Sequence, residues 1–567
     1  MKISDYIVSF LADKGITDVF GYPGGMVTHL MDSFNKQNRI TAHVNYHEQG
    51  AAFCACGYAQ ASLRPGVAYA TSGPGATNLI TGIANAYFDS IPCIFITGQV
   101  NTYESKGGLS VRQKGFQETE IIGIVQSVTK YAVQVTKPEE IRYELEKAFC
   151  ICASGRPGPV LLDIPMNIQR QDIEPEELHS YEPEPKKEKP FHLADILTEL
   201  KSAKRPCMIV GAGVKISGMQ KQLRKLSDRL GIPVVSSMIA VDVLPGSYEN
   251  YYGFIGAYGE RRANFIVAKS DLILSLGSRL DCRQVGTVKE NFAPDAKLIR
   301  VDIDADEMTN IIKPDELQIA ADLRTVIPWL IENTEESLKG QYSDWIHVCN
   351  DITDRLLNID QEASNGIVKE LSKIIPENTV ITTDVGQNQV WLAQSFDIKD
   401  NQEMFFSGGH GAMGYSLPAA IGAYYGSGKT VVSFNGDGGV QMNIQELQFI
   451  AREKIPVKVV ILNNHSLGMI RHFQEMYFDS IYTQTVTDNG YTVPSFQKIA
   501  AAYDLPYYCI SENIPSDDKI FSEDGPAVIE VMLPHETYVF PKLAMNKPNQ
   551  DQEPAIDREI YDYLMNL

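Results

Sequence analysis

The stretch VVSFNGDGGVQMNIQEL, residues 431–447, contains an apolar run, a glycine turn around Asp437 and a segment with helical periodicity. A glycine turn between a strand and a helix exposes backbone N–H groups and suits a phosphate group. A bare carboxylate would repel that phosphate unless a divalent cation lay between the two. Mg²⁺ takes oxygen ligands from one or two protein groups together with the phosphates of a bound molecule. The stretch therefore predicts a phosphate site bridged by a metal ion.

A second oxygen ligand follows one strand later in the sequence. The apolar run VKVVILNN, residues 457–464, ends in Asn463 and Asn464. Ligands of open α/β sheets bind where parallel strands end, so we expect Asp437 and Asn464 to face one cation. A backbone carbonyl near Ser466 would supply a third oxygen. Either motif alone is common in loops, but their order and spacing make the combination specific.

The pattern of strand, glycine turn, helix, Ile-Pro and strand occurs three times, beginning at Gly66, Pro206 and Thr430. Each copy is typical of a βαβ unit, and the uninterrupted Val/Ile/Leu strands predict parallel sheets covered on both faces. A charged stretch that contains proline, at 170–190, and a less distinct charged stretch, at 333–345, separate the copies. We expect an α/β protein with three doubly wound parallel-sheet domains and a polar tail that wraps the surface, at residues 1–180, 190–340, 360–545 and 546–567.

Composition narrows the class of function. The chain has 567 residues and a net charge of −21, which argues against a nucleic-acid partner and against an anionic membrane surface. No apolar run reaches the length of a membrane span and no secretory leader is recognisable, so we expect a cytoplasmic location. The nine cysteines include no CxxC pair and are expected to be reduced, mostly buried thiols.

The GDG turn, the apolar strand and the terminal NN together resemble the metal and diphosphate motif of thiamine-diphosphate enzymes. The chain as a whole, up to about residue 535, resembles the acetolactate synthase family. Further signatures of that family occur in order, namely GYPGG (21–25), HEQGAAF (47–53), TSGPGATN (71–78), FQE (116–118), GRPGPVLLDIP (155–165), GSRLDCR (277–283), VDIDADE (301–307), VGQNQ (385–389) and SGGHGAMGYSLPAAIGA (407–423).

The resemblance implies specific roles for residues at these motifs. Glu48 would be catalytic, because a carboxyl group beside the aminopyrimidine of thiamine diphosphate assists its activation. Gln117 would also act in catalysis, and Met413 would support the bent cofactor. A helix N-terminal glutamate and a core methionine are the structural alternatives for Glu48 and Met413. The other implied cofactor contacts are Pro23, Gly24, Gly73, Asn78, Gly386, Gln387, Asn388, Gly436, Gly438, Gly439 and Met469.

The central segment is similar to the FAD-binding stretches of the family, through Gly211, Gly213, Arg279, Asp302 and Asp322. The resemblance implies a flavin without a redox role, as in acetolactate synthases, whereas pyruvate oxidases use theirs for redox chemistry. A nucleotide-binding fold without its ligand stays open as an alternative. Arg279 would contact either the flavin or the carboxylate of an acceptor.

The family pattern also assigns a substrate pocket, and three of its positions differ here. Phe473 stands where tryptophan is usual, Met166 where lysine is usual and His410 where leucine is usual. These changes remove a cation and reshape the pocket mouth, which makes an anionic second 2-oxo acid a less expected acceptor, unless the changes are neutral drift. The complete set of pocket residues is Gly25, Phe116, Met166, His410, Ile470 and Phe473.

The tail segment KPNQDQEPAIDRE, residues 547–559, is similar to that of a polysaccharide-cluster branch of the family, the yersiniose-type carboligases. The resemblance thus implies a carboligase that decarboxylates pyruvate and transfers its two-carbon unit to a second pyruvate or to a nucleotide-linked keto-sugar. Its active sites would lie between the subunits of a homodimer or homotetramer.

Other function classes stay open for the same chain. A flavin-dependent pyruvate oxidase and a simple 2-oxo acid decarboxylase use the same cofactor. A non-catalytic cofactor-binding subunit is disfavoured, because every position that the chemistry needs is present.

Overall fold

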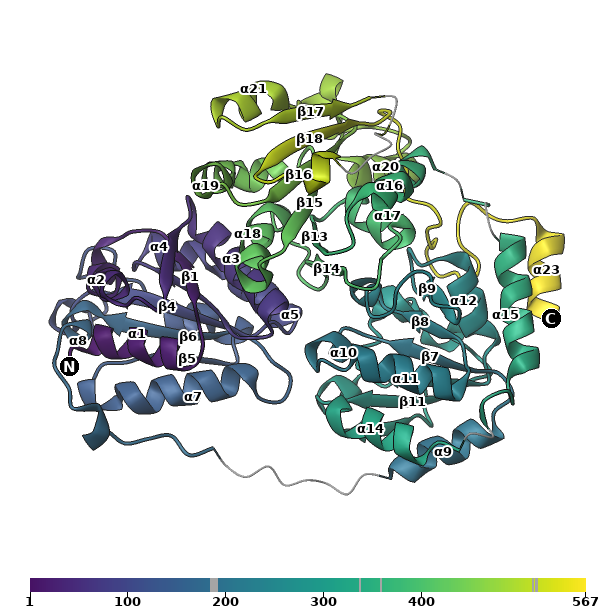
Figure 1. Ribbon diagram of the computed structural model, residues 1–567, viewed down its shortest axis with the longest axis horizontal. Coiled ribbons are helices and arrows are strands. Elements are labelled where there is room, and N and C mark those ends of the chain that lie inside the picture. Colours follow the sequence, from purple (N-terminus) through teal and green to yellow (C-terminus); the bar gives the residue numbers. More distant parts are fainter. Residues whose placement is uncertain (184–191, 336–337, 357–358, 361, 512–513, 515–518) are drawn as a thin grey trace.

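Three sheets organise the protein. The computed structural model describes residues 1–183, 192–335, 338–356, 359–360, 362–511, 514 and 519–567. Each lobe in Figure 1 contains one six-stranded sheet: the N-terminal lobe is purple to blue, the central lobe teal and the C-terminal lobe green. Every strand pair in the three sheets is parallel. The predicted α/β class with three parallel sheets is confirmed.

The N-terminal sheet has the order β2-β1-β3-β4-β6-β5. Its strands are β1 (Asp18–Gly21), β2 (Thr41–Val44), β3 (Gly66–Ala70), β4 (Cys93–Gln99), β5 (Tyr131–Gln134) and β6 (Val160–Pro165). Parallel strands need long crossovers, and the helices in these crossovers are α1 (Ile3–Asp13), α2 (Thr28–Lys36), α3 (Glu48–Ser62), α4 (Pro74–Asn78), α5 (Ile80–Phe88), α6 (Ile121–Val125), α7 (Ile141–Ala153) and α8 (Met166–Gln169).

The C-terminal sheet repeats this topology, in the order β14-β13-β15-β16-β18-β17. Its strands are β13 (Thr379–Thr383), β14 (Glu403–Phe406), β15 (Thr430–Gly436), β16 (Val457–Asn463), β17 (Tyr507–Ile510) and β18 (Ala527–Met532). The helices are α16 (Ala363–Ile374), α17 (Gln387–Ser395), α18 (Ser416–Ser427), α19 (Leu447–Glu453), α20 (Gly468–Tyr477), α21 (Phe496–Ala502) and α22 (Lys519–Ser522).

The helix expected directly after the GDG turn differs from the prediction. A 3₁₀ segment, Val440–Glu446, comes first, and α19 begins only at Leu447. Asn443 breaks the helical backbone with φ −133°. Its side-chain amide donates to the carbonyl of Gly414 at 2.8 Å and to Oε1 of Gln49 at 3.1 Å. These tertiary hydrogen bonds outweigh the helical periodicity of the sequence.

The central sheet has a different order, β12-β11-β10-β7-β8-β9. Its strands are β7 (Pro206–Val210), β8 (Val234–Ser236), β9 (Tyr251–Phe254), β10 (Leu272–Leu276), β11 (Lys297–Asp302) and β12 (Leu317–Ala320). The strand order reverses between β7 and β10, as it does in dinucleotide-binding folds. The helices of this region are α9 (Leu193–Ser202), α10 (Gly213–Ile216), α11 (Gln220–Leu230), α12 (Arg261–Lys269), α13 (Cys282–Val285), α14 (Leu323–Asn333) and α15 (Ser343–Leu356).

The C-terminal tail lies along the surface of the central lobe, where α23 (Arg558–Asn566) runs beside α15 in Figure 1. Leu564 is fully buried in the central core. The amides of Asn549 and Gln552 donate to the carbonyls of Gln284 and Gly259, at 2.6 and 2.9 Å. The tail is therefore fastened by hydrogen bonds and by two buried apolar side chains, those of Leu564 and Ile556.

The cysteines and the lengths of the helices can also be compared with the sequence analysis. All nine cysteines are unpaired, and six of them are buried. In the described ranges, no helix has the length and apolarity that a membrane crossing requires.

Helices α3 and α18 join the N-terminal lobe to the C-terminal lobe, and one apolar cluster continues across their contact. Glycine permits this close approach. A Cβ added at Gly57 of α3 would lie 2.0 Å from the carbonyl oxygen of Ala419, and one at Gly422 of α18 would lie 1.8 Å from that of Cys54. The two backbones therefore touch where a methyl group has no room.

Substitution Gly57→Ala should force the two helices apart and lower the free energy of unfolding by about 2 kcal/mol, the usual cost of overpacking. Differential scanning calorimetry would measure this as a lower unfolding temperature. Gly366→Ala is the matched control, because Gly366 lies in exposed helix α16 with nothing within 4 Å of an added Cβ. Equal unfolding temperatures for the two variants would contradict the packing argument.

Candidate active site

The ends of β15 and β16 lie side by side, with Gly436 paired to Leu462. Asp437 follows β15 and is buried. Its Oδ1 accepts a hydrogen bond of 2.7 Å from the hydroxyl of Tyr491, whereas its buried Oδ2 has no hydrogen-bond partner among the described residues. Buried carboxylate oxygens are rarely left unsatisfied, and Oδ2 could accept a cation as its partner.

Asn464 lies on the neighbouring strand end and is also buried. Its Oδ1 accepts from the backbone N–H of Ser466 at 3.1 Å, and its Nδ2 donates to Oγ1 of Thr537 and Oε1 of Gln387, at 2.7 and 3.1 Å. The amide orientation is thereby fixed, and Oδ1 keeps a second lone pair. Among the described residues, no three or more His, Cys, Asp or Glu side chains are arranged so that they could hold a metal ion by themselves. A cation held here would therefore take amide, carbonyl and ligand oxygens besides Asp437, as Mg²⁺ does.

The electrostatics of Asp437 also suit a cation. Burial raises the pKa of its carboxyl group, and the hydrogen bond from Tyr491 opposes this shift only in part. A positive charge beside Oδ2 would offset the cost of burying the ionised form.

The glycines of the turn leave no space for side chains. A Cβ at Gly438 would lie 2.7 Å from Cδ2 of Leu467 and 3.7 Å from Cε of Met413. A Cβ at Gly439 would lie 2.1 Å from Oδ2 of Asp384. Predicted residues Gly438 and Met413 are thus neighbours, and the turn offers backbone N–H groups to a ligand.

Other predicted positions of the C-terminal lobe gather around the same strand ends. Gly386 has φ +149°, a conformation that favours glycine, and it precedes α17, which begins at Gln387. A Cβ at Gly468 would lie 1.9 Å from Oε1 of Gln387, and one at Gly436 would lie 3.4 Å from Oδ1 of Asn388. Met469 is half-buried beside Gly468 in the first turn of α20.

A second cluster forms at the edge of the N-terminal sheet. Glu48 begins α3 and is buried, and its Oε2 accepts from Nδ2 of Asn78 at 2.9 Å. A Cβ at Gly75 would lie 3.1 Å from Oε1 of Glu48. Gly24 follows Pro23 and closely approaches Thr71, because its added Cβ would lie 2.4 Å from Cβ of Thr71.

Gln117 lies next to this cluster, because it packs closely against Gly73. A Cβ at Gly73 would lie 3.0 Å from Cβ of Gln117, and both residues have positive φ. The loop is held by Glu118, whose carboxylate accepts from the backbone N–H groups of Lys106, Lys114 and Gly115. Partial burial alone would raise the pKa of Glu118, but these donors lower it to about 2.

Three carboxylates that the sequence argument missed position these clusters or the domains around them. Glu446 of the C-terminal lobe accepts from Nδ2 of Asn45 and from the N–H of Tyr46, both at 2.9 Å, just before Glu48. Asp384 accepts from the N–H groups of Gly414 and Tyr415 and so holds the loop of Met413. Burial raises the pKa of both Glu446 and Asp384 to about 7. Asp89 accepts from the N–H groups of Gly408 and Gly409, at 3.0 and 2.6 Å.

Local sequence patterns give little indication of these carboxylates or of Tyr491. Glu446 lies inside the quoted 431–447 stretch, but its partners are 400 and 401 residues away. Tyr491 follows a loop without regular periodicity, so nothing local connects it to Asp437.

The six predicted pocket residues belong to both the N-terminal and the C-terminal lobe, and two of them, Ile470 and Phe473, lie three residues apart on α20. Phe116, Ile470 and Phe473 are 80%, 53% and 45% exposed. His410 stacks on Phe88 with ring centroids 5.6 Å apart. In the described ranges no hydrogen bond or aromatic contact joins any two of the set, which also includes Gly25 and the partly exposed Met166 at the start of α8.

A cavity lies at the carboxyl edge of the central sheet, where the strand order reverses. Its lining includes Gly213, Arg279, Asp302 and Asp322, four of the five residues predicted to contact a flavin. The fifth, Gly211, lies where the turns after β7 and β10 touch, because its added Cβ would be 2.1 Å from the carbonyl oxygen of Gly277.

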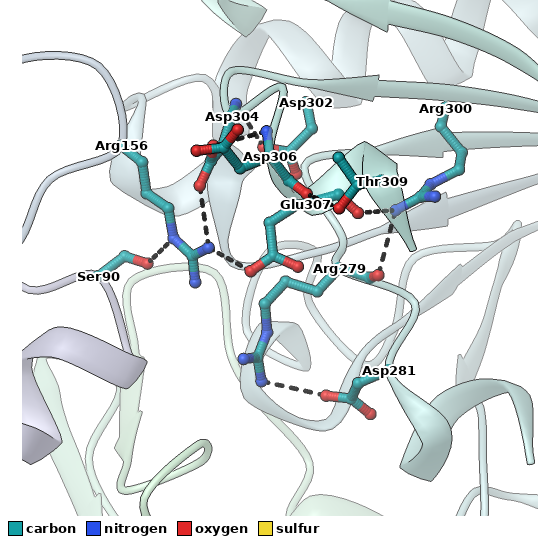
Figure 2. A network of polar contacts seen from close by, with 10 residues as sticks. All are labelled: Ser90, Arg156, Arg279, Asp281, Arg300, Asp302, Asp304, Asp306, Glu307 and Thr309. Carbon is teal, nitrogen blue, oxygen red and sulfur yellow. Dashed lines mark hydrogen bonds and ion pairs between the residues drawn. The ribbon is translucent and has the colours of Figure 1, made fainter. Parts of the chain in front are cut away.

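Arg156 of the N-terminal lobe also lines this cavity, and Figure 2 shows the polar network around it. Its guanidinium donates to Oγ of Ser90 at 2.7 Å, to Asp304 at 3.2 Å and to Glu307. Buried Arg300 donates to the carbonyl oxygens of Arg279 and Glu307, at 3.3 and 3.2 Å. Two loops of the central lobe are therefore tied to each other and to the N-terminal lobe.

Comparison with known proteins gives consistent matches along the chain. Residues 1–124 match the N-terminal TPP binding domain of thiamine pyrophosphate enzymes, residues 193–330 the central domain and residues 384–531 the C-terminal TPP binding domain. The acetolactate synthase large subunit of Lactococcus lactis is 36% identical over 552 residues, 95% of this chain and 94% of its own length. The acetolactate synthase isozyme 2 large subunit of Escherichia coli is 34% identical over 97% of this chain and 99% of its own length.

Substitution Tyr491→Phe should weaken Mg²⁺ binding about 10-fold to 100-fold, because it removes the hydroxyl that orients Asp437. Isothermal titration of the protein with Mg²⁺ in the presence of thiamine diphosphate would measure the loss. Tyr482→Phe is the control, since the Tyr482 hydroxyl on the same loop bonds to Glu475 instead. Unchanged Mg²⁺ affinity in Tyr491→Phe would refute this positioning role.

Proposed function

The chain belongs to the acetolactate synthase family of thiamine pyrophosphate enzymes, and we propose that it decarboxylates pyruvate and joins the two-carbon unit to a carbonyl acceptor. The bond between C1 and C2 of pyruvate breaks and carbon dioxide leaves. A new bond joins C2 to the carbonyl carbon of the acceptor, whose oxygen gains a proton. The overall reaction consumes one proton and involves no net oxidation.

One observation carries the proposal: Oδ2 of Asp437 is buried without a partner at the glycine turn. Mg²⁺ held by Asp437, Asn464 and a carbonyl near Ser466 would satisfy that oxygen and bind a diphosphate group. Thiamine diphosphate, when bound, supplies the carbon nucleophile and the electron sink of the reaction. The backbone N–H groups of the turn at Gly436, Gly438 and Gly439 would bind its phosphates, because this turn has no side chains in the way.

The remaining residues would bind and orient the cofactor. Glu48 would share a proton with a pyrimidine nitrogen, and Asn78 fixes its carboxyl group. Met413, beside Gly438, would support the ring system. Gln117 would act from its strained loop position, at φ 62°.

We further propose that a second copy of the chain completes the active site. Glu48 and Asp437 belong to different lobes, and within the described ranges no hydrogen bond joins them. The exposure of Phe116 and Phe473 agrees with pocket walls that a partner subunit covers. A homodimer or homotetramer would satisfy both observations.

The central cavity supports FAD as a second, non-redox cofactor. Its strand order is that of dinucleotide-binding folds, and Arg279, Asp302 and Asp322 line it. The location of Arg279 in this lining favours the flavin over an acceptor as its contact. Nine unpaired thiols agree with the reducing cytoplasm as the place of the reaction.

The protein incubated with pyruvate, thiamine diphosphate and Mg²⁺ should release carbon dioxide and form a ligated product without consuming oxygen. Glu48→Gln should reduce turnover at least about 100-fold with an unchanged circular dichroism spectrum, because the variant cannot exchange the proton. Glu139→Gln, at an exposed position of the same lobe, is the control. Oxygen uptake would indicate an oxidase, free aldehyde a decarboxylase, and wild-type turnover in Glu48→Gln would exclude the assigned role.

The purified protein should carry FAD that denaturation releases. Anaerobic pyruvate should leave its visible absorbance unchanged, because the proposed reaction moves no electrons to the flavin. Bleaching of the flavin by pyruvate would contradict the non-redox assignment.

A further inference from the structure

The side chain of Lys542 lies beside helix α20, where the chain leaves the C-terminal lobe and begins to wrap the central lobe. Its Nζ is 3.2 Å from Sδ of Met476 and 5.9 Å from the centroid of the Phe473 ring. Phe473 is the residue assigned above to the wall of the acceptor pocket. The tail therefore brings a cation to that wall.

Lys542 has no counter-ion. Among the described residues, no carboxylate lies within ion-pair distance of its Nζ, although the side chain is half-buried. Burial lowers the pKa of Lys542, and no neighbouring charge offsets this shift. Partial burial of an unpaired ammonium group is unfavourable, so the site gains free energy when an anion enters.

A purely structural role explains the position less well. A cation and an aromatic ring attract within about 6 Å of the ring centroid, and Nζ at 5.9 Å from Phe473 is at that limit. The thioether of Met476 is only a weak acceptor. Neither contact compensates for the partial loss of water around the ammonium group.

The backbone at Lys542 is held firmly. Its N–H donates to the carbonyl of Glu553 at 2.9 Å, and its carbonyl accepts from the N–H of Glu553 at 2.7 Å. The next N–H, of Leu543, donates to the carbonyl of Ala257 at 2.7 Å. The fold thus fixes the position of a side chain whose ammonium group has only a thioether and an aromatic ring as partners among the described residues, an arrangement typical of a preorganised binding group.

Helix α20 connects this position with the metal-binding strand ends. Gly468, its first residue, closely approaches Oε1 of Gln387 and Nδ2 of Asn464. Phe473 lies five residues further, roughly 7 Å along the helix axis. Lys542 is therefore next to the candidate site but separated from the cation by more than a helical turn, which suits an acceptor better than a diphosphate.

We propose that Lys542 binds the negatively charged group of the acceptor, a carboxylate or a phosphate, and that the acceptor of this carboligase is anionic. The inference rests on the proposed function. Position 166, where the family usually has lysine, is methionine here.

The test measures carboligation at a fixed concentration of pyruvate with three added acceptors: a 2-oxo acid other than pyruvate, a phosphorylated keto-sugar and neutral acetaldehyde. Lys542→Met should raise KM for the anionic acceptor at least about 10-fold while changing kcat and KM for acetaldehyde less than about 2-fold. Lys542→Arg should retain most of the affinity, because it keeps the charge. The acceptor whose KM changes more identifies the bound group as carboxylate or phosphate.

Lys547→Met is the matched control, since Lys547 lies on the same tail and is paired with Glu553 at 2.8 Å. It should leave the KM of the anionic acceptors unchanged. Equal KM changes for charged and neutral acceptors in Lys542→Met, or no change for either, would overturn the proposal. So would a wild-type protein that ligates acetaldehyde but neither anionic acceptor.

Release of carbon dioxide by the wild-type protein tests the proposed function separately. If no carbon dioxide appears, the function fails, and calorimetric titration with the phosphorylated keto-sugar and with pyruvate still tests the lysine. Weaker binding in Lys542→Met than in Lys547→Met would support the anionic site. Equal binding in the two variants would exclude it.

Discussion

The site depends on one buried carboxylate with unequal oxygens. Oδ1 of Asp437 is tied to Tyr491, and Oδ2 has no partner in the described protein. Leaving such an oxygen unsatisfied costs free energy. A cation bound beside it would compensate for this cost. The crowded glycines, the fixed amide of Asn464 and the nearby Met413 all serve that geometry. The similarity to acetolactate synthases agrees with this chemistry along nearly the whole chain.

The sequence predicts the parts of this arrangement that local patterns encode. Apolar runs that end in Gly-Asp-Gly and Asn-Asn predict β15 and β16 and the placement of Asp437 beside Asn464, and the structure pairs these strands. The three α/β sheets follow from the same strand, turn and helix pattern. The helix after the turn was placed wrongly, because Asn443 forms hydrogen bonds to Gly414 and Gln49 that periodicity does not reveal.

Contacts between distant segments lie beyond such patterns. Tyr491, Asp384 and Glu446 act on residues 30 to 401 positions away, and each is unremarkable in its own segment. Lys542 belongs to the same class. Its neighbours Phe473 and Met476 are 69 and 66 residues earlier, and only the path of the tail across α20 brings them together. Long-range polar contacts of this kind define the site but carry no periodic signal.

The junction formed by Phe88, Asp89 and Ser90 gives the central cavity an unusual dependence on the whole chain. Asp89 accepts hydrogen bonds from Gly408 and Gly409 of the C-terminal lobe. Ser90 accepts a hydrogen bond from Arg156, and Arg156 also donates to Asp304 of the central lobe. The lining thus draws on all three lobes and exists only when they have docked. A molecule that binds this docked state and not the unfolded chain stabilises all three lobes at once. With the cavity occupied, the three lobes would unfold together in one cooperative transition. A ligand that takes no part in the chemistry would then stabilise the whole fold.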